Sequence, residues 1–162
     1  MDVVAGLSMT GVPDRVPPLT PLEIPGLVRV SYQVYPIADH VADKVIACFE
    51  TRTRDDGSVS VSTRYKDLVD LVVFSRSAGM TAMALRRALS SEAERRGMTL
   101  PLGFLVPSEA WVAGYEARAR EVSDLGDLAM FPAALDRVRR LLDPVLAGTA
   151  QGEWDPSAAV WR

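Results

Sequence analysis

The stretch that decides the fold spans residues 35–49 and reads YPIADHVADKVIACF. Its apolar residues recur at the i, i+4, i+8, i+12 spacing that predicts an amphipathic helix from Ile37 to Thr51. Pro36 ends the segment before this helix. Lys44 lies one residue from the centre of the apolar stripe, so we expect a lysine at the border of the buried face.

The chain before this helix is expected to contain strands and a loop. Residues 1–9 read as an apolar strand, and residues 27–35 alternate between two faces, which is the pattern of a half-buried strand. Residues 10–26 carry five prolines and therefore predict a loop without regular hydrogen bonding.

The chain after the first helix is expected to be mainly helical. Thr81 opens a helix that Gly97 closes, because threonine is a favoured N-cap and glycine accepts the left-handed conformation after a helix. Before it, a turn over residues 55–58 leads to a helix that Ser62 or Thr63 caps and that runs to about Arg76. Two more helices are predicted over residues 107–122 and 127–146.

These elements predict an α+β protein with three parts. Residues 1–36 would hold about two to three strands and the proline-rich loop, and residues 37–147 would form a helical bundle. Residues 148–162 would be a tail, in which an extended segment is pinned by the rings of Trp154 and Trp161.

Composition narrows the class of protein. The chain has 162 residues, of which 48% are hydrophobic and 24% charged, which suits one domain or two very small ones. No apolar run approaches the roughly 20 residues of a membrane span, and the first residues lack the pattern of a secretory leader, so we expect a cytoplasmic protein without a membrane partner. The single cysteine and single histidine exclude an internal disulfide and a Cys/His zinc site. The net charge of −3 argues against nucleic-acid binding through bulk charge alone.

A second charged segment, residues 64–71, reads RYKDLVDL. Its carboxylates Asp67 and Asp70 share one face just inside a helix N-terminus, a pattern that is typical of a solvated cap facing the helix dipole. However, Asp70 is flanked by apolar residues, and a partly buried carboxylate requires a cation. The candidate cations are Arg64, Lys66 and Lys44.

The two segments together resemble the two C-terminal motifs of the AbiEii/AbiGii nucleotidyltransferase toxins, over roughly residues 1–120. In that family an alanine-rich helix offers a lysine that contacts nucleotide phosphates, and Lys44 stands in that place. The second motif has the form Arg-x-Lys-Asp-x-x-Asp at a helix start. It is reproduced by Arg64, Lys66, Asp67 and Asp70.

The resemblance implies a role for each of these residues. Lys44 and Asp67 would be catalytic, and Arg64 and Lys66 would join Lys44 in binding the nucleotide. Asp70 and Asp43 would be structural members of the motifs, and Asp2 resembles a metal-binding carboxylate of the polymerase-β-like fold, where Mg²⁺ would bind. The upstream Gly-Gly/Ser and Asp-x-Asp motifs of the family do not occur, so we expect the chain to correspond to the C-terminal part of such an enzyme.

The implied function is that of a toxin in a type IV-like toxin–antitoxin system. It would transfer a nucleotide from an NTP to an RNA acceptor, the 3′ end of a tRNA, and would bind a cognate antitoxin. Nucleotidyl transfer uses two metal ions, which Asp2 alone does not hold. Two alternatives therefore stay open: a catalytically incomplete helical remnant that binds only nucleotide or antitoxin, and a structural module in which Lys44 and Asp67 form an ion pair.

Three further features receive a structural interpretation. His40 is expected to be a surface partner of Asp39 or Asp43 rather than a general base. Trp111 and Tyr115, four residues apart on a helix, are expected in the core. Nine arginines that alternate with glutamates are expected on solvated faces, with an RNA-binding surface as the alternative. These are Arg86, Arg87, Arg95, Arg96, Arg118, Arg120, Arg137, Arg139 and Arg140.

Overall fold

The computed structural model describes residues 9–17, 31–53 and 55–162. In these ranges the chain forms five α-helices and three separate two-stranded antiparallel sheets, which confirms the predicted α+β class. None of the helices in the described ranges combines the length and apolar content that a membrane crossing requires. The helices are α1 (Ile37–Phe49), α2 (Tyr65–Ser77), α3 (Ala82–Arg95), α4 (Ala110–Ala119) and α5 (Phe131–Leu146).

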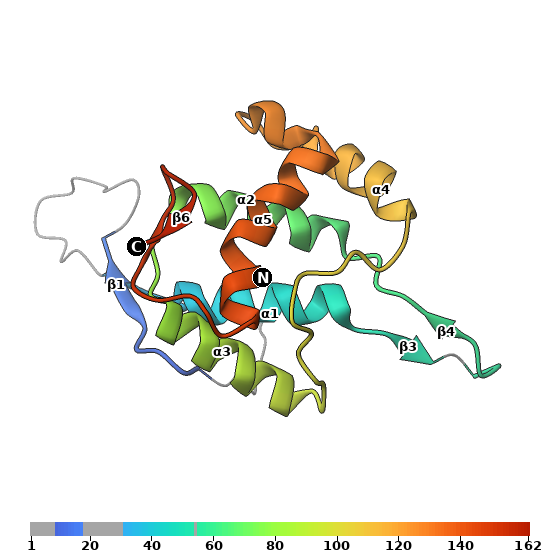
Figure 1. The fold of residues 1–162 in the computed structure, drawn as a ribbon, viewed down its shortest axis with the longest axis horizontal. Coiled ribbons are helices and arrows are strands. Elements are labelled where there is room, and N and C mark those ends of the chain that lie inside the picture. The colour runs from blue at the N-terminus through green and yellow to red at the C-terminus, as the bar shows by residue number, and fades with distance from the viewer. Residues whose placement is uncertain (1–8, 18–30, 54) are drawn as a thin grey trace, which may run out of the picture.

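Helix α1 lies at the centre of the fold, packed against both α2 and α3 (Figure 1). The apolar stripe explains this position, because Val41, Val45 and Ile46 are fully buried. Helix α4 covers α2, and α5 packs across α2 and α3. The predicted first helix is thus confirmed, although it ends at Phe49 instead of Thr51.

The ends of α3 follow the predicted capping. Thr81 Oγ1 accepts a hydrogen bond from the Ala84 amide at 3.1 Å, and Gly97 adopts a φ of 63° just after the helix. The predicted cap of α2 is wrong, because this helix begins after Arg64 without a side-chain cap. The Ser62 hydroxyl is buried and instead donates to the Ala47 carbonyl at 2.8 Å, which ties the approach to α2 onto α1.

The last two predicted helices are shorter than expected. Helix α4 covers only Ala110–Ala119 of the predicted range 107–122. The predicted helix 127–146 is divided into a 3₁₀ turn, η1 (Gly126–Ala129), and α5. Pro132 explains the division, because proline is tolerated in the first turn of a helix but removes a hydrogen bond from its interior.

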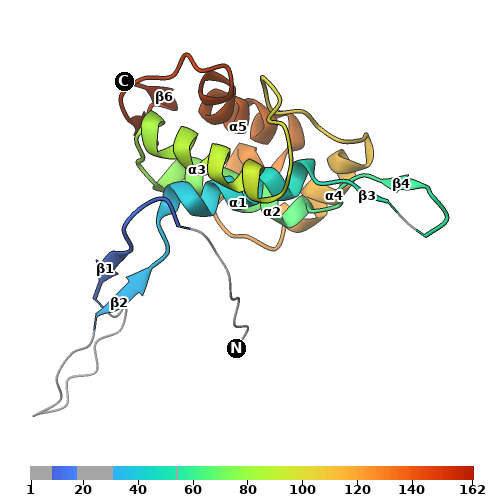
Figure 2. The ribbon, with the colours of Figure 1, turned by 90° about the horizontal axis from the view of Figure 1, so that it is seen from below.

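Two short hairpins project from the helices at opposite ends of the molecule (Figure 2). Strand β1 (Asp14–Val16) pairs with β2 (Tyr32–Val34), and β3 (Arg52–Thr53) pairs with β4 (Val59–Ser60) around the predicted turn.

The N-terminal strand predictions are corrected by the first hairpin. The predicted loop contains β1, and β2 is exposed instead of half-buried because the hairpin stands clear of the helices. Residues 1–8 and 27–30, which belong to the predicted strands, lie outside the described residues. The predicted boundaries of the three parts stay predictions.

The tail forms a third hairpin of β5 (Trp154–Asp155) and β6 (Val160–Trp161). The indole of Trp154 donates to the Ser75 carbonyl at 2.8 Å, and that of Trp161 donates to the Leu141 carbonyl at 3.0 Å. The prediction that these two rings pin the tail is therefore confirmed, but the tail folds back as a hairpin. Its backbone also pairs with the connection between α2 and α3, where the Trp154 amide donates to the Met80 carbonyl at 2.9 Å.

Candidate functional site

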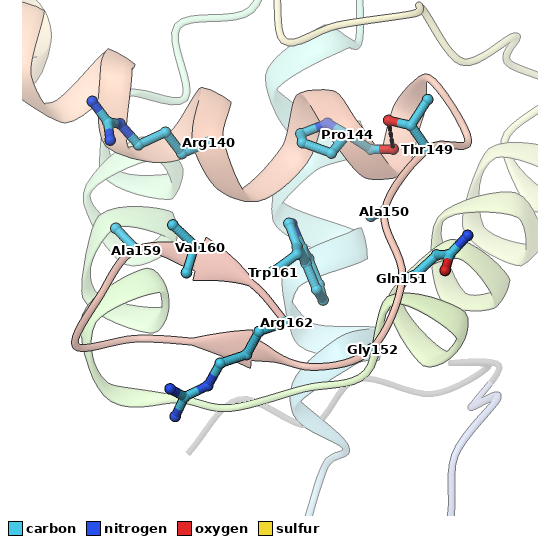
Figure 3. A pocket seen from close by; sticks show the side chains of 10 residues that line it. All are labelled: Arg140, Pro144, Thr149, Ala150, Gln151, Gly152, Ala159, Val160, Trp161 and Arg162. Carbon is cyan, nitrogen blue, oxygen red and sulfur yellow. Dashed lines mark hydrogen bonds between the residues drawn. The ribbon is translucent and has the colours of Figure 1, made fainter.

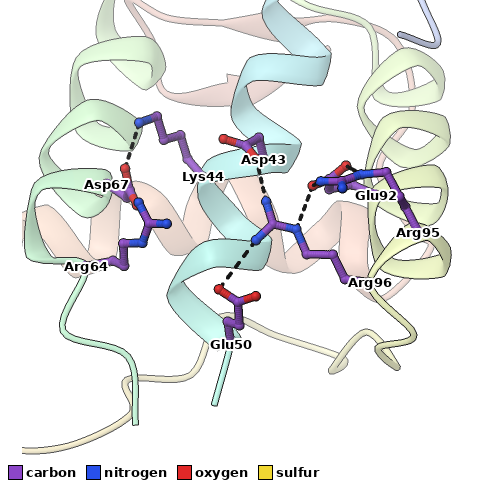
Figure 4. A network of polar contacts seen from close by, with 8 residues as sticks. All are labelled: Asp43, Lys44, Glu50, Arg64, Asp67, Glu92, Arg95 and Arg96. Atoms are coloured by element: carbon purple, nitrogen blue, oxygen red, sulfur yellow. Dashed lines mark hydrogen bonds and ion pairs between the residues drawn. The ribbon is translucent and has the colours of Figure 1, made fainter. Parts of the chain in front are cut away.

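Lys44 meets the start of α2 because α1 and α2 pack side by side (Figure 4). Its Nζ lies 2.7 Å from Asp67 Oδ1 and 3.0 Å from Asp70 Oδ2. The two carboxylates are three residues apart on one helix face, so both reach the same ammonium group. The structure thus brings together Lys44 and the two aspartates that the second motif contributes.

Asp67 is the most buried member of this group, with 6% of its side chain exposed. Its Oδ1 holds Lys44, whereas its Oδ2 is buried and has no hydrogen-bond donor within the described residues. Arg64 Nη1 lies 3.5 Å from this oxygen, which makes an ion pair without a hydrogen bond. A buried carboxylate oxygen without a donor is costly, so Oδ2 has an unused capacity to accept a hydrogen bond.

Lys44 carries a firmly held positive charge. Burial alone would lower the pKa of its ammonium group, but the hydrogen bonds from Lys44 to Asp67 and Asp70 and the charges of both carboxylates outweigh that effect and raise the pKa. The side chain keeps 22% of its surface exposed. A charged phosphate could therefore reach the ammonium from the solvent side.

The other predicted site residues occupy different surroundings. Arg64 is 52% exposed at the rim of the group, and Lys66 is exposed without an ion pair in the described part of the chain. Asp43 binds Arg96, just after the end of α3, and not Lys44 (Figure 4). Asp2 lies outside the described residues.

A second charged group joins α1 to the C-terminal end of α3. Glu92 accepts from Arg96 Nε at 2.7 Å and from Arg95 Nε at 2.8 Å, and Arg96 Nη2 reaches Asp43 Oδ1 at 2.5 Å. Its hydrogen bond from Arg95 is the main cause that lowers the pKa of Glu92. Arg96 also lies 3.6 Å from Glu50, so three carboxylates surround one guanidinium.

This group corrects the expectation that Arg96 lies on a solvated face, because its side chain is only 17% exposed. Arg95 and Arg96 follow Glu92 at the i+3 and i+4 spacing of helical ion pairs, so the sequence itself indicates this pairing. Arg118 and Arg140 are solvated as expected, each more than half exposed and paired with one surface carboxylate. Arg139 is also exposed as expected and donates to the Phe104 carbonyl, whereas Arg137 is half-buried and donates to the Ser75 carbonyl.

Helix α4 supports the segment that leads into Asp67. The indole of Trp111 donates to the Ser62 carbonyl at 2.9 Å, and both Trp111 and Tyr115 are fully buried, as predicted. A Cβ atom at Gly114 would lie 2.5 Å from the Tyr65 ring, so glycine permits this ring to pack on the helix backbone. A glycine inside a helical pattern often has such a packing reason, which is the signal that identifies Gly114.

His40 does not have the expected partners. It is exposed, and its ring lies 5.4 Å from the ring centroids of both Tyr35 and Phe74. Asp39 is engaged elsewhere, because it accepts hydrogen bonds from the amide and the hydroxyl of Thr10, both at 2.9 Å.

The Mg²⁺ ion that the resemblance implies is expected at Asp2, which lies outside the described residues. No group of three or more metal-binding side chains gathers in the described ranges. Asp67 and Asp70 are both engaged by the Lys44 ammonium group, which occupies the space between them that a divalent ion would need. Both carboxylates are therefore engaged in ion pairs with Lys44.

Two cavities lie away from Lys44. One, of about 760 Å³, lies between α5 and the β5–β6 hairpin, and the other, of about 410 Å³, lies between the residues before β1 and the starts of α1 and α3. Neither is lined by Lys44 or Asp67. These two cavities are therefore separate from the Lys44 group.

Comparison with known proteins places both motifs in one family. The family model described as nucleotidyl transferase AbiEii toxin, type IV toxin–antitoxin system, matches residues 10–157. The match extends past residue 120 through α5 and into the tail hairpin, further than the two motifs alone indicate. No curated protein and no solved structure matches the chain. The chain belongs to the nucleotidyl transferase AbiEii toxin family of type IV toxin–antitoxin systems.

Proposed function

We propose that Lys44 and Asp67 contribute to an active site that transfers a nucleotide from an NTP to the 3′ end of a tRNA, and that a cognate antitoxin restrains this activity. The observation that supports the proposal most strongly is the buried Asp67, which orients Lys44 with one oxygen and leaves its other oxygen without a donor. Family membership supports the NTP and the antitoxin as partners.

Lys44 would stabilise the negative charge of the triphosphate. Asp70 is 30% exposed, whereas Asp67 is 6% exposed, so a phosphate oxygen can replace the Asp70 contact while Asp67 keeps the ammonium oriented. A fixed cation directed at developing charge is worth more than a mobile one, because no reorganisation is needed during the reaction. Arg64 and Lys66, both exposed, would add two cations at the rim.

Because Asp67 Oδ2 is buried, it would accept a hydrogen bond from the 3′ hydroxyl of the acceptor once the exposed Arg64 side chain, 3.5 Å away, moves aside. In the transfer, the hydroxyl oxygen bonds to the α-phosphorus, the bond from that phosphorus to pyrophosphate breaks, and the hydroxyl proton leaves toward Asp67 or solvent. The unused acceptor capacity of Oδ2 suits this contact. Asp43, bound to Arg96, would keep α1 and hence Lys44 in place, while Asp70 would hold Lys44 until the NTP binds.

The test is transfer of label from α-labelled NTPs to total tRNA in the presence of Mg²⁺. We expect Lys44→Met and Asp67→Asn to lower transfer by about 100-fold or more, the loss typical of removing one preorganised electrostatic contact. Arg118→Met, on the solvated face of α4, is the control and should transfer at the wild-type rate. The proposal fails if the wild-type protein transfers no label or if both site variants match it.

The structural alternative rests on a specific observation. Lys44 already binds two carboxylates, as in an ion pair that only joins α1 to α2. In that case Lys44→Met would change the free energy of unfolding without changing NTP affinity. A binding remnant would retain Lys44-dependent NTP binding, measured by calorimetry, while transferring nothing.

A further inference from the structure

An open groove of about 760 Å³ lies between α5 and the β5–β6 hairpin (Figure 3). Its volume falls within the usual range of small-ligand sites. The lining combines one tryptophan ring, Trp161, with two arginines, Arg140 and Arg162, and with the polar side chains of Thr149 and Gln151. None of these residues belongs to the Lys44 site.

The Trp161 ring is held in place at the centre of the groove. Its indole nitrogen donates to the Leu141 carbonyl at 3.0 Å, and its ring centroid lies 5.6 Å from that of Trp154. The ring is only half-buried and lines the cavity. It therefore offers a preformed flat apolar wall to a planar ligand.

The two arginines stand at the rim and are weakly engaged. Arg140 is 57% exposed and binds Asp136 at 2.8 Å, while Arg162 is 75% exposed and binds Asp155 at 2.9 Å. Single ion pairs at such exposed positions contribute little, so a phosphate can compete for either guanidinium.

Further positive charge lies beside the groove. Arg137 donates to the Ser75 carbonyl at 2.6 Å and to the Pro156 carbonyl. Burial, followed by the neighbouring charges of Arg76 and Arg140, lowers the pKa of Arg137. Four arginines, Arg76, Arg137, Arg140 and Arg162, thus lie at this end of the molecule, and two of them pair with Asp136 and Asp155, although the whole chain has a net charge of −3.

We propose that this groove binds one unpaired nucleotide of a single-stranded RNA. The base would stack on Trp161, and its flanking phosphates would bind Arg140 and Arg162. Stacking on a fixed aromatic ring together with arginine contacts to phosphates is the general chemistry of single-strand binding, and the groove accommodates one base rather than a duplex.

The inference rests on the proposed function, because it assigns the groove to the acceptor RNA. The groove would hold the acceptor strand at a nucleotide that precedes its reacting 3′ end.

The test measures binding of a short fluorescein-labelled single-stranded RNA by anisotropy. We expect the double variant Arg140→Glu/Arg162→Glu to weaken binding by about tenfold or more, since it replaces two phosphate contacts with two repulsive charges. Trp161→Phe, which keeps a smaller aromatic ring at the groove, should weaken binding by about threefold to tenfold. Arg118→Glu, which breaks an equally exposed surface ion pair, is the matched control and should bind normally.

Competition experiments show whether the groove binds a nucleotide within an RNA strand or a free nucleotide. Excess unlabelled single-stranded RNA should displace the probe, whereas duplex RNA and ATP should not. Normal binding by the double variant would overturn the inference, and so would full displacement by ATP, which would make the groove a site for a free nucleotide. Thermal melts of each variant show whether a loss of binding reflects unfolding.

The groove and the Lys44 site are tested independently. Lys44→Met should bind the RNA probe normally while losing transfer. If transfer depends on Lys44 but the groove variants bind RNA normally, the groove inference falls and the proposed function stands. If the groove variants lose RNA binding but no protein transfers label, the groove inference stands and the proposed function falls.

Discussion

Two charged clusters lie on different sides of α1, and they use their hydrogen-bonding capacity differently. In the Arg96 cluster (Arg96, Arg95, Glu92, Asp43 and Glu50), both oxygens of Glu92 accept hydrogen bonds and Arg96 reaches three carboxylates. In the Lys44 cluster (Lys44, Asp67, Asp70 and Arg64), the most buried carboxylate leaves one oxygen without a donor. Both clusters join helices, but only the Lys44 cluster has capacity left for a ligand.

The difference shows why charge alone does not identify a site. The Arg96 cluster has more charged groups, yet its pairing is nearly complete and its central groups are mostly buried. A buried and fully bonded network holds helices together, and removing one member leaves buried charges without partners. The Lys44 cluster is similarly exposed, so the buried oxygen without a donor is the feature that sets it apart.

The largest expected difference in stability comes from matched carboxylate-to-amide changes. We expect Glu92→Gln to lower the free energy of unfolding by about 2–3 kcal/mol, because it weakens several charge-assisted hydrogen bonds at once. Asp67→Asn should cost about 1 kcal/mol or less, since it alters one such bond and Lys44 keeps Asp70. Urea denaturation at neutral pH measures both values. Equal losses in the free energy of unfolding would show that the hydrogen bonds of the two clusters contribute equally to stability.

A somewhat smaller effect is expected from Gly114→Ala. The added methyl group would lie 2.5 Å from the Tyr65 ring and would displace the start of α2, at a cost of about 1–2 kcal/mol. Transfer should fall as well, because Asp67 follows Tyr65 by two residues, while the Arg96 cluster stays unchanged. The double variant Gly114→Ala/Tyr65→Leu should recover part of the stability in a double-mutant cycle. Additive losses would show that the methyl group acts on some other neighbour.

The smallest effect is a pH dependence with opposite directions for the two clusters. Glu92 has a lowered pKa, so its contribution to stability is present above its ordinary value of 4.5 and is lost as the pH falls through the lowered value. Lys44 has a raised pKa, so its contribution is present below its ordinary value of 10.5 and is lost as the pH rises through the raised value. Thermal melts from acid to alkaline pH should show the acid decline reduced in Glu92→Gln and the alkaline decline reduced in Lys44→Met. If the pH profile of stability is unchanged in either variant, the replaced side chain does not cause the decline assigned to it.

Much of the helical framework could be predicted because its signals are local. The apolar stripe of α1, the Thr81 cap and the Gly97 stop each depend on a few neighbouring residues, and all three are confirmed. The sequence also indicated a cation for the partly buried Asp70, with Arg64, Lys66 and Lys44 as the candidates. The structure places the Lys44 ammonium on Asp67 as well as on Asp70.

The parts of the fold and of the site that could not be predicted depend on contacts between distant segments, which local sequence patterns do not encode. Strand β1 exists only because residues 14–16 find β2 across the proline-rich segment, and Arg96 is buried only because α3 lies on α1. The unused oxygen of Asp67 is likewise a property of packing, since it depends on which donors the surrounding helices bring near. The catalytic and nucleotide-binding roles stay proposals that the transfer assay decides.

The attachment of the tail hairpin also has a consequence for synthesis on the ribosome. The Trp154 indole donates a hydrogen bond to the Ser75 carbonyl across a sequence separation of 79 residues. The backbone amide of Trp154 donates to the Met80 carbonyl. The end of α2 therefore emerges long before its partner, and its carbonyl must be solvated or shielded in the meantime. Ribosome-bound chains that stop before residue 154 should leave this end accessible to proteases, and longer ones should protect it once the hairpin docks.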